Sequence, residues 1–252
     1  MRIKGETVEE MCGFLDAVQA RSQLLPATTR PVIVLPSYNG ARKLPVLTPL
    51  LALLLAREGF AVLLHGMRTE AQRVLASEVL QRLEVPVWER MQPLAAGQVA
   101  HVATEVLHPG LARLLAVRQV LGLRTPGHSL VKLLAPCAGP AVLVGSYTHP
   151  EYSGLMRDVL IARQMTGLLS RGLEGEVVCD PRRQPRYDAV WQGQAYCVAE
   201  QQAGTLAAVP GLPQAIDAQT TADYTRAVLA GQLPVPQAVA AQVAHITALA
   251  QR

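Results

Sequence analysis

The sequence predicts an α/β fold: a large lobe with a mostly parallel central sheet flanked by helices. Of the 252 residues, 50% are hydrophobic but only 4% are aromatic, so the core must consist mainly of Leu, Val and Ala, which suits helices packed on a buried sheet. A strand-like run, Val32–Leu35, precedes an apolar helix-like run, Leu47–Arg57, and a second strand-like run, Phe60–Gly66. A strand, a crossover helix and a strand imply parallel pairing.

The other elements follow from capping residues and apolar runs. Thr7 can cap a helix that reaches about Leu24, because Glu10 stands three residues later and an apolar series follows. This helix either packs on the main body or belongs to a helical lobe whose other part lies upstream, and a linker over 26–31 follows it. Further helices are expected over 70–83, 109–122, 150–164, 221–230 and 236–250, and strands over 85–88, 141–147 and 167–171.

Charge and cysteine content limit the class of protein. The net charge of +4 permits an acidic partner without requiring one. The segment 106–150 contains no Asp or Glu and would form a positive surface if exposed. Arginines outnumber lysines by 20 to 3, which suits phosphate oxygens, although a GC-rich genome explains this ratio better. The four cysteines have neither zinc nor disulfide spacing, so we expect buried thiols in a soluble cytoplasmic protein without a membrane span: Cys12, Cys137, Cys179 and Cys197.

Three features are candidates for a site. The polar loop Pro36–Lys43 follows a strand, where parallel sheets bind ligands, so it is either an anion site or a charged surface connection. Arg118 falls within a predicted apolar stripe of Leu111, Leu114, Leu115 and Leu121, so it must meet a carboxylate, a carbonyl cluster or a bound anion. The pair Glu174 and Glu176 could hold a metal or act in acid and base chemistry, but such a pair in a loop is also a common accident.

Four motifs resemble the anthranilate phosphoribosyltransferase family: KGET-x-EEM near the start, RQVLGLRT at 118–125, KLLAP at 132–136 and HPEY at 149–152. The resemblance implies a small helical lobe, of which 1–25 is a remnant, and a large α/β lobe over 26–252. It implies that the chain starts inside the small lobe, and that Met1 is an internal methionine of a longer protein. The family transfers the phosphoribosyl group of phosphoribosyl pyrophosphate with magnesium.

The chain departs from this family where the reaction needs charge. The family's GTGGD loop aligns with Pro36–Lys43, its KHGNR motif with Leu64–Arg68, and its Asp-Glu magnesium pair with Gly172–Glu176. Here the loop has one glycine and no carboxylate, the lysine of the second motif is absent, and the adjacent carboxylates have become Glu-Gly-Glu. Without the glycine loop and the metal pair, the departing pyrophosphate would lack stabilisation, so we expect no catalytic residue and no metal. The resemblance leaves a vestigial ligand cleft, with His108 and Arg118 where the family receives the anthranilate carboxylate: Ser37, Asn39, Gly40, His65, Arg68, His108, Arg118, Glu174 and Glu176.

The runs PSYNGARK, LTPLLALLL, HPEY and G-x-EGE are more similar to the YbiB-type branch of this family. That resemblance implies a homodimer that binds DNA or RNA through a basic groove with little sequence preference. No helix-turn-helix, finger or set of stacking aromatics is evident, so contact would be to phosphates. The candidate contacts are Arg42, Lys43, Arg113, Arg118, Arg124, Lys132, Arg157 and Arg163.

Two functions follow as hypotheses. The first is a non-enzymatic nucleic-acid binder that needs no cofactor. The second is a glycosyltransferase or phosphoribosyltransferase of altered specificity, which uses magnesium and phosphoribosyl pyrophosphate with an unknown aromatic or carboxylate acceptor. A small-anion sensor is a third possibility that the sequence does not separate from them.

Overall fold

The computed structural model describes residues 5–252, so Lys4 of the KGET motif lies outside the described part. The fold is built on an eight-stranded sheet with the order β3-β4-β2-β1-β5-β6-β7-β8. The first six strands in this order pair in parallel, and β7 pairs antiparallel with both β6 and β8, which confirms the predicted mostly parallel α/β fold. The strands are β1 Val32–Pro36, β2 Val62–Gly66, β3 Val87–Trp88, β4 Val99–Ala103, β5 Ala141–Tyr147, β6 Thr166–Arg171, β7 Tyr187–Trp191 and β8 Gln194–Ala199.

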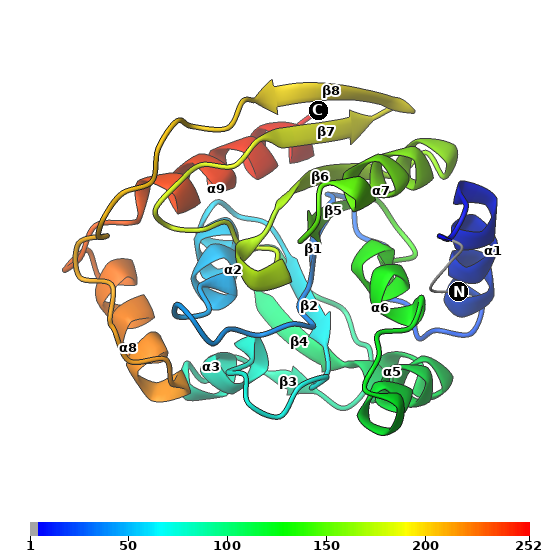
Figure 1. Cartoon of the computed structure of the whole chain (residues 1–252), viewed down its shortest axis with the longest axis horizontal. Helices are drawn as coiled ribbons and strands as arrows, with labels where there is room; N and C mark the ends of the chain where they lie inside the picture. Colours follow the sequence, from blue (N-terminus) through cyan, green and yellow to red (C-terminus); the bar gives the residue numbers. More distant parts are fainter. Residues whose placement is uncertain (1–4) are drawn as a thin grey trace.

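Helices cover both faces of this sheet (Figure 1). One face carries α2, α3, α8 and α9, and the other carries α1, α5, α6 and α7. The helices are α1 Val8–Gln19, α2 Thr48–Arg57, α3 Ala76–Arg82, α4 Thr104–Leu107, α5 Pro109–Leu121, α6 Gly127–Leu130, α7 Glu151–Ala162, α8 Ala218–Leu229 and α9 Gln237–Ala250, with short 3-10 turns η1 Val131–Leu133 and η2 Leu173–Gly175.

The strand β1 explains how two cores form around one sheet. Side chains alternate between the faces of a strand, so Ile33 and Leu35 enter the core under α2 and α9, whereas Val32 and Val34 enter the core under α1 and α7. All five residues of β1 are buried. The continuous apolar run in the sequence therefore correctly predicted a strand that is buried on both faces.

The predicted strand–helix–strand unit is confirmed, because β1 and β2 pair in parallel with Ile33 opposite Val62. The helix expected over 70–83 is shorter and starts at Ala76, because Val74 forms an antiparallel bridge with Ala41 of the β1 loop. The strand expected over 85–88 contains only Val87 and Trp88. The strands β4, β7 and β8 were not predicted.

The first helix has the predicted capping box, in which Thr7 Oγ1 accepts from the N–H of Glu10 at 3.2 Å. It ends at Gln19 rather than near Leu24. Arg163, which follows the last residue of α7, donates to the Asp16 carboxylate at 2.5 Å and to the Cys12 carbonyl at 3.2 Å, so the first helix packs on the large lobe. The proposed lobe boundary at 25 stays a prediction.

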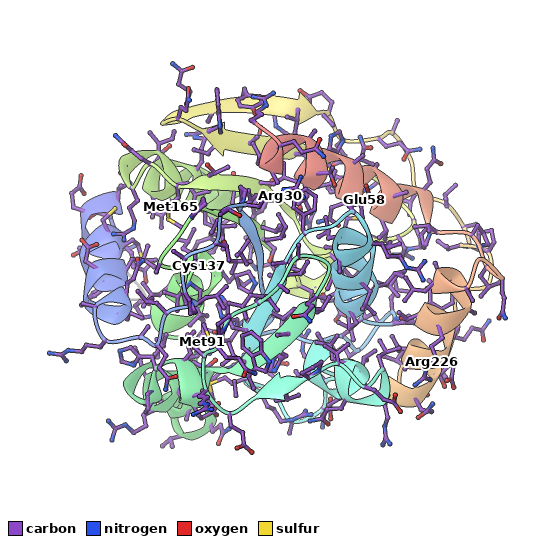
Figure 2. The ribbon with its side chains drawn as sticks, turned by 180° about the vertical axis from the view of Figure 1, so that it is seen from behind. Arg30, Glu58, Met91, Cys137, Met165 and Arg226 are labelled. Atoms are coloured by element: carbon purple, nitrogen blue, oxygen red, sulfur yellow. The ribbon has the colours of Figure 1, made fainter. Side chains whose placement is uncertain are left out.

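All four cysteines are free, as expected, but only Cys137 and Cys179 are buried, whereas Cys12 is half-buried and Cys197 is exposed on β8. Among residues 5–252 no helix is both long enough and apolar enough to cross a membrane. Figure 2 shows the molecule from behind and labels Arg30, which precedes β1, and Glu58, which follows α2.

Candidate functional site

The candidate site lies at the carboxyl ends of the central strands. The chain runs from β1 to β2 on one side and later places β5 on the other side, so the strand order reverses at β1. Such a reversal is where open α/β sheets form ligand crevices. Three segments meet there: the loop Ser37–Lys43 after β1, the residues after Gly66 of β2, and the turn Gly172–Glu176 after β6.

Glu176 is the centre of this meeting point and is only 1% exposed. Its Oε1 accepts from the backbone N–H groups of Asn39 at 2.8 Å and Gly40 at 2.7 Å. Its Oε2 accepts from the hydroxyls of Ser37 at 2.5 Å and Thr48 at 3.0 Å. Gly40 has φ 64°, a left-handed conformation that points two successive N–H groups at one oxygen. The loop therefore is an anion-binding nest, and Glu176 is the anion.

Glu174 fills a second pair of donors on the same loop. Its Oε2 accepts from the backbone N–H groups of Arg42 at 2.8 Å and Lys43 at 2.9 Å. Its Oε1 forms ion pairs with the Arg42 side chain at 3.6 Å and with Arg73 at 3.5 Å. The two glutamates thus occupy two separate pairs of N–H groups along one loop.

The turn that carries these glutamates has two successive residues in the left-handed backbone conformation. Glu174 has φ 52° and Gly175 has φ 88°. A Cβ at Gly175 would lie 2.0 Å from Asn39 Nδ2, so only glycine allows this approach. The ammonium of Lys132 donates to the Gly175 carbonyl at 2.9 Å and to the Ser146 carbonyl at 3.3 Å, which ties the turn to β5.

The prediction that Lys132 contacts nucleic acid from the surface is therefore wrong. It is 8% exposed, and its burial lowers its pKa to about 8, an effect that the nearby Glu176 carboxylate opposes. Its donors are used inside the protein. No feature of the sequence indicated this, because a single Lys in an apolar run is usually solvated.

Arginines surround Glu70, which follows β2. Glu70 accepts from Arg73 Nε at 2.6 Å and from Arg118 Nη2 at 2.5 Å, and Arg124 Nη2 lies 3.7 Å away. Partial burial raises the pKa of Glu70, but the hydrogen bonds from Arg73 and Arg118 outweigh it and hold the pKa at about 2. Arg118 Nη1 is buried and has no hydrogen-bond partner within residues 5–252. Of the three kinds of partner expected for Arg118, the structure shows a carboxylate, that of Glu70, while Nη1 has no partner among the described residues.

Arg73 joins this cluster to the loop. It contacts Glu70, Glu174 and the Gly40 carbonyl. A continuous chain of charges results, which we call the arginine network; it contains four arginines and two glutamates, namely Arg42, Arg73, Arg118, Arg124, Glu70 and Glu174. Four positive and two negative side chains give it a formal charge of +2. Sequence reasoning missed Glu70 and Arg73, although their i,i+3 spacing was visible.

The apolar stripe predicted for α5 is only partly correct. Leu111 and Leu115 are buried, but Leu114 and Leu121 are exposed, because α5 is covered on one side only. His108 accepts from the N–H of Leu111 at 2.9 Å and so caps α5.

Two other residues of the expected cleft are structural. His65 is fully buried, and its ring lies 2.8 Å from the Tyr38 hydroxyl and 2.9 Å from the Leu134 carbonyl. Burial lowers its pKa to about 4. Arg68 forms an ion pair with Glu78 at 2.7 Å and donates to nearby carbonyls, so neither residue faces the loop's N–H groups.

The remaining candidate contacts to nucleic acid fall into two groups, those that form ion pairs and those that form none in the described part of the chain. Arg157 pairs with the adjacent Asp158, and Arg163 with Asp16, so both belong to α7 and its neighbours and not to the loop. Lys43 and Arg113 are exposed and form no ion pair in the described part of the chain.

The donors around Glu174 and Glu176 do not fit a magnesium ion. Their oxygens accept from N–H groups, hydroxyls and guanidinium groups, all of which would repel or compete with a cation. Over residues 5–252 no group of three or more His, Cys, Asp or Glu side chains is arranged to hold a metal.

Comparisons with known proteins identify relatives of the chain. No protein-family model matches the chain. The chain is 36% identical over 251 residues to the uncharacterized protein YbiB of Escherichia coli K12, and the match covers 97% of this chain and 78% of YbiB. It is 30% identical over 243 residues to anthranilate phosphoribosyltransferase of Leifsonia xyli, with 92% and 68% covered.

Solved structures show the same fold. Anthranilate phosphoribosyltransferase of Thermus thermophilus superposes with a TM-score of 0.73 at 23% identity, over 99% of this chain and 76% of that one. The enzyme of Saccharomyces cerevisiae in complex with PRPP and Mg gives 0.70 at 14% identity, over 97% and 71%.

Proposed function

Because the chain belongs to the anthranilate phosphoribosyltransferase-like family, which includes YbiB as one of its relatives, we propose that it uses this fold to bind nucleic acid and not to transfer a phosphoribosyl group. The proposal includes no cofactor. It rests on one observation above all: the loop donors that could hold a diphosphate are engaged by Glu176 and Glu174, while the arginine network carries spare positive charge.

The first support is the state of the loop. A leaving diphosphate needs donors that are free to receive its charge. The four N–H groups of Asn39, Gly40, Arg42 and Lys43 already donate to carboxylates. A substrate would have to displace two negative groups, one of which is almost fully buried.

The second support is the arginine network. Three arginines, Arg73, Arg118 and Arg124, share the Glu70 carboxylate, and Arg118 keeps a buried donor with no partner in the described chain. Burial and the neighbouring Arg118 lower the pKa of Arg124, as expected where cations crowd together. A phosphate oxygen placed here would gain charge-assisted hydrogen bonds and relieve that repulsion.

The third support is two exposed cations that form no ion pair in the described part of the chain. Arg113 lies on α5 in the segment without carboxylates, and Lys43 lies on the loop itself. Contacts of this kind reach phosphates and not base edges, so binding would be insensitive to sequence. Lys132 is excluded from the contacts by its burial, and the ion pairs of Arg157 and Arg163 make them weaker candidates. A homodimer would extend the basic surface, and light scattering tests that part of the proposal.

Fluorescence anisotropy with labelled single- and double-stranded DNA tests this function. Wild type should bind both with a Kd of about 10⁻⁴ to 10⁻⁶ M and should weaken as salt rises from about 50 to 200 mM. The double variant Arg118→Ala with Arg124→Ala should bind at least about tenfold more weakly and with a smaller salt slope. The matched control is Arg30→Ala, an exposed arginine near the amino-terminal end of β1 (Figure 2). Absence of binding at the lower salt concentration would remove the proposal.

A transferase of altered specificity is the second candidate. The free Nη1 of Arg118 could receive the carboxylate of an acceptor. Calorimetry with phosphoribosyl pyrophosphate and magnesium separates the candidates, because micromolar binding would favour the enzyme.

A further inference from the structure

The loop Ser37–Lys43 has the form of a site for two linked anionic groups. Asn39 and Gly40 aim two N–H groups at one carboxylate oxygen, and Arg42 and Lys43 aim two more at one oxygen of a second carboxylate. Backbone donors paired in this way form nests that bind phosphate-type oxyanions. Two nests on one short loop suit an anion that carries two charged groups.

The occupants of these nests come from far along the chain. Glu176 is 137 positions from Asn39, and Glu174 is 132 positions from Arg42. The turn that delivers them depends on Gly175 and on the Lys132 and Ser146 side chains, which both donate to the Gly175 carbonyl. The protein therefore uses three supporting features to hold two carboxylates against the loop.

The surrounding charges would suit an external dianion as well. Arg42 and Arg73 pair with Glu174, and the buried ammonium of Lys132 lies close to Glu176. The hydroxyls of Ser37 and Thr48 add two uncharged donors. If the two carboxylates were absent, these cations and donors would remain in place around an unfilled nest.

We infer that the Glu174-Gly175-Glu176 turn is a built-in substitute for a diphosphate, which blocks an otherwise competent site for diphosphate-type anions. The inference goes beyond nucleic-acid binding, because it concerns which anion the backbone donors of the loop can hold. It makes Glu174 and Glu176 autoinhibitory residues. A diphosphate ester and free pyrophosphate share this chemistry, so inorganic pyrophosphate is a suitable probe.

The test compares wild type with the double variant Glu174→Ala and Glu176→Ala. The probe is inorganic pyrophosphate without metal, followed by calorimetry and by the backbone amide NMR signals of Gly40 and Lys43. We expect wild type to show no shift of these signals at about 1 mM probe. The variant should bind at least about tenfold more tightly than wild type, shift both signals, and prefer pyrophosphate over orthophosphate.

Controls keep the inference open to refutation. Glu78→Ala removes a carboxylate that pairs with Arg68 outside the loop, and should behave as wild type. If the double variant does not fold, Glu174→Ala alone opens the nest at Arg42 and Lys43, and their amide signals should respond to orthophosphate. A folded variant without signal shifts would overturn the inference, as would wild type with equally large shifts. The DNA titration replaces Arg118 and Arg124, whereas this test replaces Glu174 and Glu176, so either idea can fail alone.

Discussion

Glu176 Oε1 accepts a hydrogen bond from the backbone N–H of Asn39 at 2.8 Å, although 137 positions separate the two residues. This contact joins the loop after β1 to the turn after β6. The sequence led us to expect a loop that had lost its donors together with the glycines of the GTGGD loop. The structure shows instead that backbone N–H donors are present and that an internal carboxylate accepts from them.

Replacement of Glu176 by Ala should destabilise the protein by about 3–5 kcal/mol, since it leaves two N–H groups, two hydroxyls and the Lys132 ammonium without their anion. Urea unfolding at pH 7 measures this loss. Glu176→Gln should lose less, because the amide keeps one acceptor for the N–H groups. A loss below about 1 kcal/mol for the alanine variant would contradict a structural role for the carboxylate.

Replacement of Gly175 by Ala should be much more harmful than Gly193→Ala. Both residues have a positive φ, 88° and 72°. A Cβ at Gly175 would meet Asn39 Nδ2 at 2.0 Å, whereas nothing lies within 4 Å of a Cβ at Gly193. We expect about 1 kcal/mol for the control and at least about 2 kcal/mol more at Gly175. Equal losses in thermal unfolding would show that the turn is not pressed against the loop.

Glu70→Gln should lower stability but strengthen DNA binding. The change removes the carboxylate shared by Arg73, Arg118 and Arg124, so the arginine network gains one net positive charge. The salt slope of DNA affinity should steepen by about 0.9 for each phosphate gained. Anisotropy titrations at three salt concentrations check this. Weaker binding by a folded variant would argue against phosphate contact at the network.

Acid should destabilise the protein at pH values well above those at which ordinary carboxylates take up protons. Burial lowers the pKa of His65, His101 and His128 from 6.5 to about 4. The unfolded chain then binds more protons between pH 6.5 and 4, so the free energy of unfolding rises with pH across this window and is lost as pH falls. His65 and His101, the two most deeply buried, should each contribute about 2 kcal/mol of this loss between pH 7 and pH 5.

His101→Leu provides the matched variant for that pH dependence. His101 Nδ1 is buried without a partner among residues 5–252, so an apolar side chain of similar size should not reduce stability at pH 7. In urea unfolding, the slope of its free energy of unfolding against pH should correspond to one bound proton fewer than in wild type. An unchanged slope would mean that His101 does not titrate on unfolding.

The sequence predicted those parts of the fold that depend on local patterns. The buried β1, the crossover helix α2 and the capping box at Thr7 follow from apolar runs and short-range spacing. β4 was missed, although it is largely buried, and β8 has exposed and half-exposed residues throughout, so no apolar run marks it.

The candidate site was predictable only in outline. The loop after β1 and Arg118 were identified, but Glu176 was interpreted as part of a lost metal pair. Its actual partners, Asn39 and Gly40, become visible only when β1 and β6 are placed in one sheet. Long-range pairing of this kind has no local signature.

The most direct measurement is a titration of wild type into labelled single-stranded DNA at about 50 mM salt, with and without phosphoribosyl pyrophosphate and magnesium. We predict binding in the micromolar range that salt weakens and that the added substrate leaves unchanged, with no phosphoribosyl transfer. Failure to bind DNA at this salt concentration, or turnover of the added substrate, would contradict the proposed function.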